Sequence, residues 1–176
     1  MSRTFPELLD ELIALFARDG HVAYLPRPLP DGLDELVCRI VRAYRESEPD
    51  DQALLSCLPD IAGSVLLAFA ERWAAVAVRT QRLGALHEAA MAVGLAASLR
   101  GDEREGMLVM PLLWHAAATL GVHQAHLFSS VAGELPPAGA GALRAFVARK
   151  PEDQTLECMG YCVGADEQGF RYVRTW

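Results

Sequence analysis

The chain has 176 residues, of which 52% are hydrophobic, so it is long and apolar enough to bury the core of one domain spanning residues 1–176. Only 7% of the residues are aromatic, and alanine and glycine are abundant, which favours closely packed helices over a β-sandwich. The formal net charge is −7, and a chain of this charge repels phosphate, which argues against nucleic acid as a partner.

Acidic side chains are concentrated near the N-terminus, where residues 1–48 are predicted to form helices. Residues 1–60 hold twelve acidic and six basic side chains, whereas the two charges nearly balance over the rest of the chain. Thr4 and Glu7 form a capping-box pattern at the start of an amphipathic helix that ends at Gly20. The acidity of this region is compatible with a basic protein partner, and it also keeps a protein soluble without any partner.

A proline-rich spacer separates this first helix from the next one. Pro26, Pro28 and Pro30 alternate with other residues and hold the chain extended. Asp31 then caps a second amphipathic helix, which runs through Tyr44. The N-terminal region is therefore predicted to contain two helices joined by an extended connection.

Residues 50–150 are predicted to form the central bundle. Asp50 caps a short helix, and the longest apolar helical run follows at Pro59–Thr80. Within this run, Glu71 and Arg72 would each cost about 2.5 to 3.5 kcal/mol at the centre of a bilayer. We therefore interpret the run as the central helix of a water-soluble bundle, not as a membrane span.

The next two helices continue this bundle. Leu83–Leu99 is rich in alanine and glycine, and the short connection before it predicts an antiparallel course beside the central helix. Asp102 caps the following helix, whose apolar part spans Met107–Leu120. Pro111 lies inside that part and is predicted to bend or split the helix near Val109.

The C-terminal part of the chain is predicted to contain two shorter helices and a hairpin. His123 stands at the cap position of a helix through Val131, a loop is expected over 136–141, and 143–147 marks the last amphipathic helix. Residues 151–176 change character, because strand-forming residues flank the sequence GADEQG. This pattern predicts a β-hairpin that packs its aromatic side chains against the helices.

The predicted fold class is all-α with a small C-terminal β-hairpin. Two arrangements of the helices remain open, a multi-helix bundle and a short paired-helix solenoid. The solenoid is suggested by Trp73 and Trp114, each of which lies on an apolar helix followed by a short turn and another helix.

Three segments give the chain a recognisable appearance: AFAERWAAVAVRT, LLWHAAATLGV and DEQGFRYVRTW. Together they resemble small helical proteins encoded in bacterial genomes, over residues 60–176. No activity is established for such proteins. The resemblance implies a helical bacterial protein and assigns no catalytic residue.

Cysteine spacing and the N-terminal sequence both indicate the compartment. The chain has four cysteines, with neither a C-x-x-C motif nor a tight metal-ligand spacing: Cys38, Cys57, Cys158 and Cys162. We therefore expect reduced thiols. Acidic residues interrupt the apolar run at the N-terminus, which does not match a signal peptide, so a cytoplasmic protein is expected.

Motifs for catalysis and cofactor binding are missing from the sequence, which lacks Glu-x-x-His, G-x-S-x-G, G-x-G-x-x-G and Walker patterns. His123 and His126 share a helix face, but no nearby Cys or carboxylate completes a zinc site. His87 and His115 are the best general-base candidates, although Glu88 points about 100° away from His87 on the same helix. We predict no metal, no cofactor and no catalytic residue.

Two classes of function remain. The first is a protein–protein interaction module without catalytic activity, and an immunity protein that masks a basic toxin is one version of it. The alternative is a small-molecule-binding bundle, or an enzyme with an unrecognised site, formed between helices by Trp73, His87, Met110, Trp114 and His115. A homodimer closed by an exposed apolar face is a third alternative.

Overall fold

The computed structural model describes residues 3–19, 32–54, 61–99, 103–148, 161–166 and 169–174. Helices dominate these ranges, which confirms the predicted helical class. In chain order they are α1 (Phe5–Asp19), α2 (Leu33–Arg45), α3 (Pro49–Gln52), α4 (Ile61–Thr80), α5 (Leu83–Ser98), α6 (Glu103–Thr119), α7 (Gln124–Glu134) and α8 (Pro137–Ala148).

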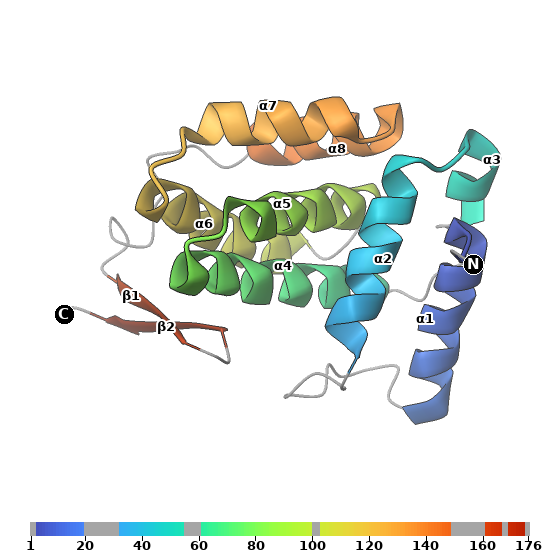
Figure 1. Ribbon diagram of the computed structural model, residues 1–176, viewed down its shortest axis with the longest axis horizontal. Coiled ribbons are helices and arrows are strands. Elements are labelled where there is room, and N and C mark those ends of the chain that lie inside the picture. Colours follow the sequence, from blue (N-terminus) through green and yellow to red (C-terminus); the bar gives the residue numbers. More distant parts are fainter. Residues whose placement is uncertain are drawn as a thin grey trace.

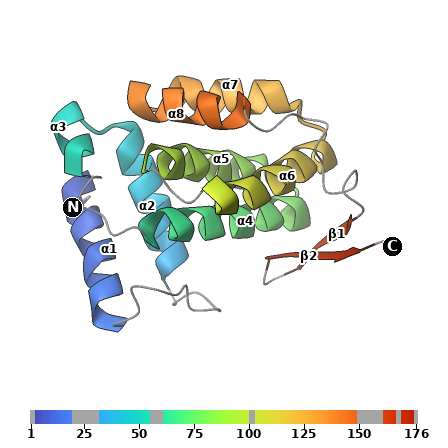
Figure 2. The same cartoon turned by 180° about the vertical axis from the view of Figure 1, so that it is seen from behind.

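The helices pack around α5. Figures 1 and 2 show α7 and α8 side by side over one side of α5, with α4 and α6 on the opposite side. α2 crosses one end of the α4–α5 pair, and α1 packs on the outer side of α2. The N-terminal helices therefore form a cap on the end of a five-helix body.

The first helix begins as its sequence predicts, whereas the second has Gly32 and not the predicted Asp31 at its N-cap position. The backbone N–H of Thr4 donates to Glu7 Oε2 at 2.7 Å, which is one half of the predicted capping box. Gly32 occupies the N-cap position of α2 with a φ of 81°, a left-handed conformation that glycine adopts without strain. The predicted cap, Asp31, lies outside the described residues.

The predicted central helix, α4, is packed on most of its sides. Phe69 is 1% exposed, and its ring meets the half-buried Trp73 edge-on with centroids 5.7 Å apart. The innermost helix, however, is α5, in which every residue from Ala89 to Ala96 is buried. Small side chains explain this position, because they allow helices on several sides to approach the α5 backbone closely.

The structure corrects two boundaries predicted from proline and glycine. α6 runs through Pro111 as one helix, so of the two predicted outcomes, a bend or a split, the split is wrong. α8 begins at Pro137, so the predicted loop over 136–141 is largely helical. Proline fits the first turn of a helix, where its missing N–H has no partner to lose. Gly139 is buried against Tyr44, whose hydroxyl would lie 2.6 Å from an added Cβ.

Two strands follow the helices, β1 (Tyr161–Asp166) and β2 (Gly169–Arg174). They pair antiparallel, with Tyr161 opposite Arg174 and Asp166 opposite Gly169. The pair lies beside α4. The predicted inward orientation of its aromatic side chains falls outside the described side chains.

None of the described helices combines the length and the hydropathy that a bilayer crossing requires.

Candidate functional site

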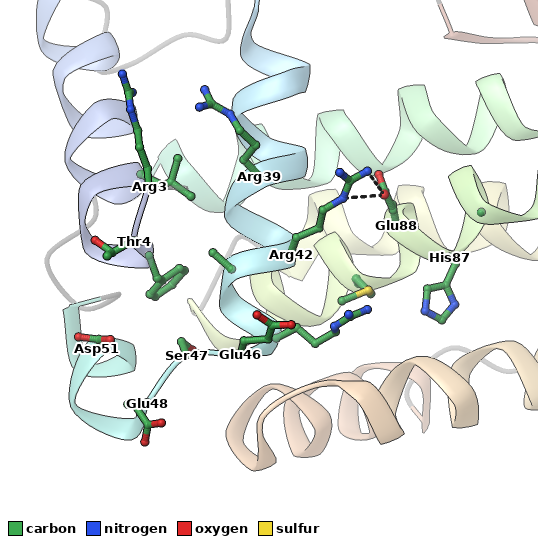
Figure 3. A pocket seen from close by; sticks show the side chains of 16 residues that line it. Arg3, Thr4, Arg39, Arg42, Glu46, Ser47, Glu48, Asp51, His87 and Glu88 are labelled. Atoms are coloured by element: carbon green, nitrogen blue, oxygen red, sulfur yellow. Dashed lines mark hydrogen bonds and ion pairs between the residues drawn. The ribbon is translucent and has the colours of Figure 1, made fainter. Parts of the chain in front are cut away.

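A groove of about 820 Å³ lies where the N-terminal cap meets the body, between α1, α2, α3 and α5. Its floor is apolar and includes the buried side chains of Phe5, Leu8 and Met91. Its walls are charged, and Figure 3 shows arginines from α2 and carboxylates from both α2 and α5 around the opening. Side chains far apart in the sequence therefore meet in one concave surface.

Glu88 of α5 organises one wall of the groove. Arg42 donates two hydrogen bonds to Glu88 Oε1, from Nε at 3.2 Å and from Nη2 at 2.7 Å (Figure 3). The Cys38 thiol donates to Glu88 Oε2 at 3.1 Å. Burial opposes ionisation of Glu88, but the bonds from Arg42 and Cys38 outweigh it, so the pKa of Glu88 is lowered. Glu88 is therefore an ionised carboxylate that links α5 to α2.

Cys38 is a free thiol held in its protonated form. Burial raises its pKa to about 12, and the hydrogen bond to the Glu88 carboxylate adds to this shift. A thiol with this pKa has almost no nucleophilic thiolate at neutral pH. The interaction therefore serves packing between α2 and α5 and does not provide a nucleophile.

Glu134, the last residue of α7, accepts bonds from two helices. His87 Nε2 of α5 lies 3.0 Å from Glu134 Oε2, and Arg45 Nη1 of α2 lies 3.1 Å from the same oxygen. The hydrogen bond with His87 is the main reason why the pKa of Glu134 is lowered. The carboxylate next to His87 is thus Glu134, whereas the sequence neighbour Glu88 binds Arg42.

Glu11 on α1 pairs with two arginines that line the groove. Arg3 donates to Glu11 Oε2, while Arg39 Nη2 lies 3.7 Å from Glu11 Oε1, which is too long for a hydrogen bond. The Arg39 Nε atom is buried and has no hydrogen-bond partner among the described residues. Arg39 is therefore the least satisfied arginine of the groove.

Three carboxylates at the α2–α3 end of the groove differ in their pairing from Glu11, Glu88 and Glu134. Glu46 and Glu48 are exposed, and Asp51 is half-buried at the same end. Within the part of the chain that the structure describes, none of the three forms an ion pair with a basic residue. We call Glu46, Glu48 and Asp51 the acidic rim.

The residues predicted to form a ligand site are dispersed. Among the members of that set whose side chains are described, only His87 lines the groove. Trp114 is 2% exposed and packs edge-on against Phe128 with ring centroids 5.1 Å apart, as expected for a core side chain. Trp73 is half-buried on α4, and its indole Nε1 is buried without a hydrogen-bond partner among the described residues. His115 is half-buried on α6, and the Met110 side chain lies outside the described residues.

The structure brings the predicted histidine pair together. His123 and His126 are exposed at the start of α7, with ring centroids 5.3 Å apart. No cluster of three or more metal-binding side chains occurs among the described residues. Two imidazoles alone leave a zinc ion without the further protein ligands of a structural or catalytic site.

Comparison with protein-family models, with curated proteins and with solved structures finds no significant match to this chain.

Proposed function

We propose that this chain is a protein–protein interaction module without catalytic activity, and that it binds a basic segment of another protein at the acidic rim. One observation carries this proposal. Glu11, Glu88 and Glu134 are engaged by arginines of the protein itself, whereas Glu46, Glu48 and Asp51 have no basic partner among the described residues. Carboxylates left unpaired at the mouth of a groove are complementary to basic side chains from outside.

The position of Glu46 supports this role. Glu46 is the C-cap residue of α2, where the helix dipole places its negative end. The favourable basic residues of the last turn, Arg42 and Arg45, are already bonded to Glu88 and Glu134. A carboxylate is therefore kept at a position that disfavours it locally, and a basic partner would relieve that repulsion.

The chemistry of the groove also supports binding in preference to catalysis. The cysteine beside it, Cys38, is held as a neutral thiol, and its bond to Glu88 joins two helices. One version of the proposed function is the masking of a basic toxin by a bacterial immunity protein. The alternative ligand site has less support, because the groove takes up only His87 among the described side chains of the predicted set.

The test is fluorescence anisotropy with a labelled peptide of alternating arginine and leucine, compared with the same peptide carrying glutamate in place of arginine. The proposal predicts that the arginine peptide binds and the glutamate peptide does not. It also predicts weaker binding at higher salt, because exposed charges are screened over about 8 to 10 Å at physiological ionic strength.

Matched variants distinguish the acidic rim from the overall negative charge. Glu46→Gln/Glu48→Gln removes two charges from the rim, and Asp10→Asn/Glu35→Gln removes two exposed charges elsewhere on α1 and α2. The rim variant is expected to weaken binding about tenfold, and the control variant less than about twofold. Equal losses in the two variants would contradict the proposal.

We further propose that the helices form a closed bundle and not a solenoid, with the β1–β2 hairpin as an addition beside α4. The surrounding of α5 by helices on several sides supports this arrangement, because a solenoid repeat contacts only its two neighbours.

A further inference from the structure

The groove carries opposite charges at its two ends. At one end lies the acidic rim, and Figure 3 shows the Arg3 and Arg39 side chains extending toward the other end. Arg3 and Arg39 both pair with Glu11, and Arg3 also interacts electrostatically with Glu7, whereas the ion pair of Arg39 is long, at 3.7 Å. Between the two ends, Arg42 is neutralised by Glu88. The groove therefore presents carboxylates at one end and arginines at the other, and we call it dipolar in this sense.

We propose that the groove selects a partner segment that carries both charges, with basic side chains at the acidic rim and an acidic side chain at Arg39. This inference rests on the proposed function and adds the polarity of the segment to it. The partner's carboxylate would accept hydrogen bonds from the Arg39 guanidinium, a group whose planar geometry suits paired bonds to a carboxylate.

Arg39 is the arginine best placed for this task. Arg42 and Arg45 already donate hydrogen bonds at 2.7 Å and 3.1 Å to carboxylates of the protein. The Arg39 side chain is 40% exposed, and its ion pairing within the described residues is limited to the 3.7 Å contact with Glu11. An incoming carboxylate at Arg39 therefore displaces no hydrogen bond between side chains of the described part of the chain.

The exposure of the arginines that line the groove favours a polypeptide over a free small molecule. Small-molecule sites usually enclose most of their ligand in apolar walls. Here Arg3, Arg39 and Arg42 leave 55%, 40% and 66% of their side chains exposed, so one side of any ligand would remain in water. A segment of a larger protein tolerates that exposure, because the rest of the partner covers the opening.

A double-mutant cycle tests the inference. The probes are a short labelled peptide with a pair of arginines at one end and a pair of aspartates at the other, its reversed sequence, and both peptides with asparagine in place of aspartate. These peptides are titrated into wild type, Arg39→Gln and Arg82→Gln. Arg82 is an exposed arginine between α4 and α5, outside the groove.

We expect one of the two sequence orders to bind wild type about fivefold to tenfold more tightly with aspartate than with asparagine. Arg39→Gln should remove this advantage, so that the aspartate and asparagine peptides bind the variant with equal affinity, whereas Arg82→Gln should keep it. Arg39→Lys should retain part of the advantage, because it keeps the charge but loses the paired geometry. Circular dichroism of each variant verifies that the fold is intact.

Two results would overturn the inference in distinguishable ways. If the arginine peptides bind at the acidic rim but aspartate gives no advantage, the dipolar selection is wrong while the proposed function stands. If no arginine-containing peptide binds wild type, both fail. An advantage that survives Arg39→Gln would place the partner's carboxylate at another group and would also refute this assignment.

Discussion

The two sides of α5 contact their neighbouring helices through different kinds of interaction. Toward the body, α5 presents alanines and glycine with almost no exposed surface, and α4 offers Ala70, Ala74 and Ala77 in the same buried state. Toward the cap, α5 meets α2 through Glu88, which binds Arg42 and Cys38. The body is therefore stabilised by close packing, whereas the cap is attached in part by charged hydrogen bonds at the edge of a groove.

This difference suggests a division of tasks within one small fold. Small apolar side chains let the helices of the body pack closely, and charged side chains around the cap form the surface at which we propose that a partner binds. Substitutions in the two regions should consequently differ in what they change. Those in the body should alter the free energy of unfolding, and those on the rim should alter binding.

The largest effect is expected for Trp114→Ala in the body. Trp114 is 2% exposed, so its removal should cost about 3 to 5 kcal/mol in the free energy of unfolding. His87→Ala, at the groove, should cost about 1 kcal/mol or less, since His87 bonds the exposed Glu134. Urea denaturation measures both. A similar loss of unfolding free energy in the two variants would contradict the proposed difference between the body and the groove.

A smaller loss is expected when the body is overfilled. Ala89 is completely buried in α5, so Ala89→Leu should destabilise the protein by about 1 to 3 kcal/mol. Ala118→Leu adds the same atoms at an exposed position of α6 and serves as the control. Thermal unfolding should show a clear decrease for the first variant and little change for the second. Tolerance of leucine at residue 89 would mean that α5 is not tightly surrounded.

The contact between α2 and α8 is tested by two glycines of one helix. A Cβ at Gly139 would lie 2.6 Å from the hydroxyl of Tyr44, a side chain that is only 1% exposed, so Gly139→Ala should cost about 1 to 2 kcal/mol. Nothing lies within 4 Å of a Cβ at Gly141, so Gly141→Ala should stabilise α8 by about 0.5 to 1 kcal/mol. Opposite signs in chemical denaturation are the expected result, and equal signs would contradict it.

The smallest expected effect is on the pH dependence of stability, through the contact between the cap and the body. The pKa of Glu88 is lowered in the folded state, so its contribution to stability is present above the ordinary glutamate pKa of 4.5 and is lost as the pH falls below it. Glu134 acts in the same direction. The pKa of Asp34 is raised by burial despite the attraction of Arg72, so Asp34 opposes this trend.

Glu88→Gln should therefore lower stability at neutral pH by about 1 kcal/mol and reduce the loss of stability below pH 4.5. Unfolding midpoints measured at several pH values in wild type and in the variant give the comparison. An identical acid dependence in the two proteins would show that Glu88 does not link stability to pH.

The helices could be predicted from local patterns, but the groove could not. The Thr4–Glu7 pattern and the apolar period of α4 depend on neighbours within one or two turns, and both predictions were confirmed. The pairing of His87 with Glu134 joins residues on different helices, and no local signal in the sequence indicates it. Geometry within one helix indicated only that Glu88 does not orient His87.

Proline and glycine were the least reliable signals. Pro137 and Gly139 indicated a loop, yet Pro137 occupies the first turn of α8 and Gly139 makes room for Tyr44. Proline and glycine can end a helix, but they can also occupy the first turn of a helix or a close contact with a neighbouring side chain. Only the tertiary neighbours distinguish these roles. The innermost position of α5 was not predicted for a similar reason, because alanine content alone does not show how many helices surround a helix.

The most direct test of this division of tasks measures stability and peptide binding together in Glu46→Gln/Glu48→Gln. Both side chains are exposed and have no ion-pair partner in the described part of the chain. We expect an unfolding free energy equal to that of wild type within about 0.5 kcal/mol, together with about tenfold weaker binding of the arginine peptide. A destabilised variant that binds the peptide as tightly as wild type would contradict this expectation.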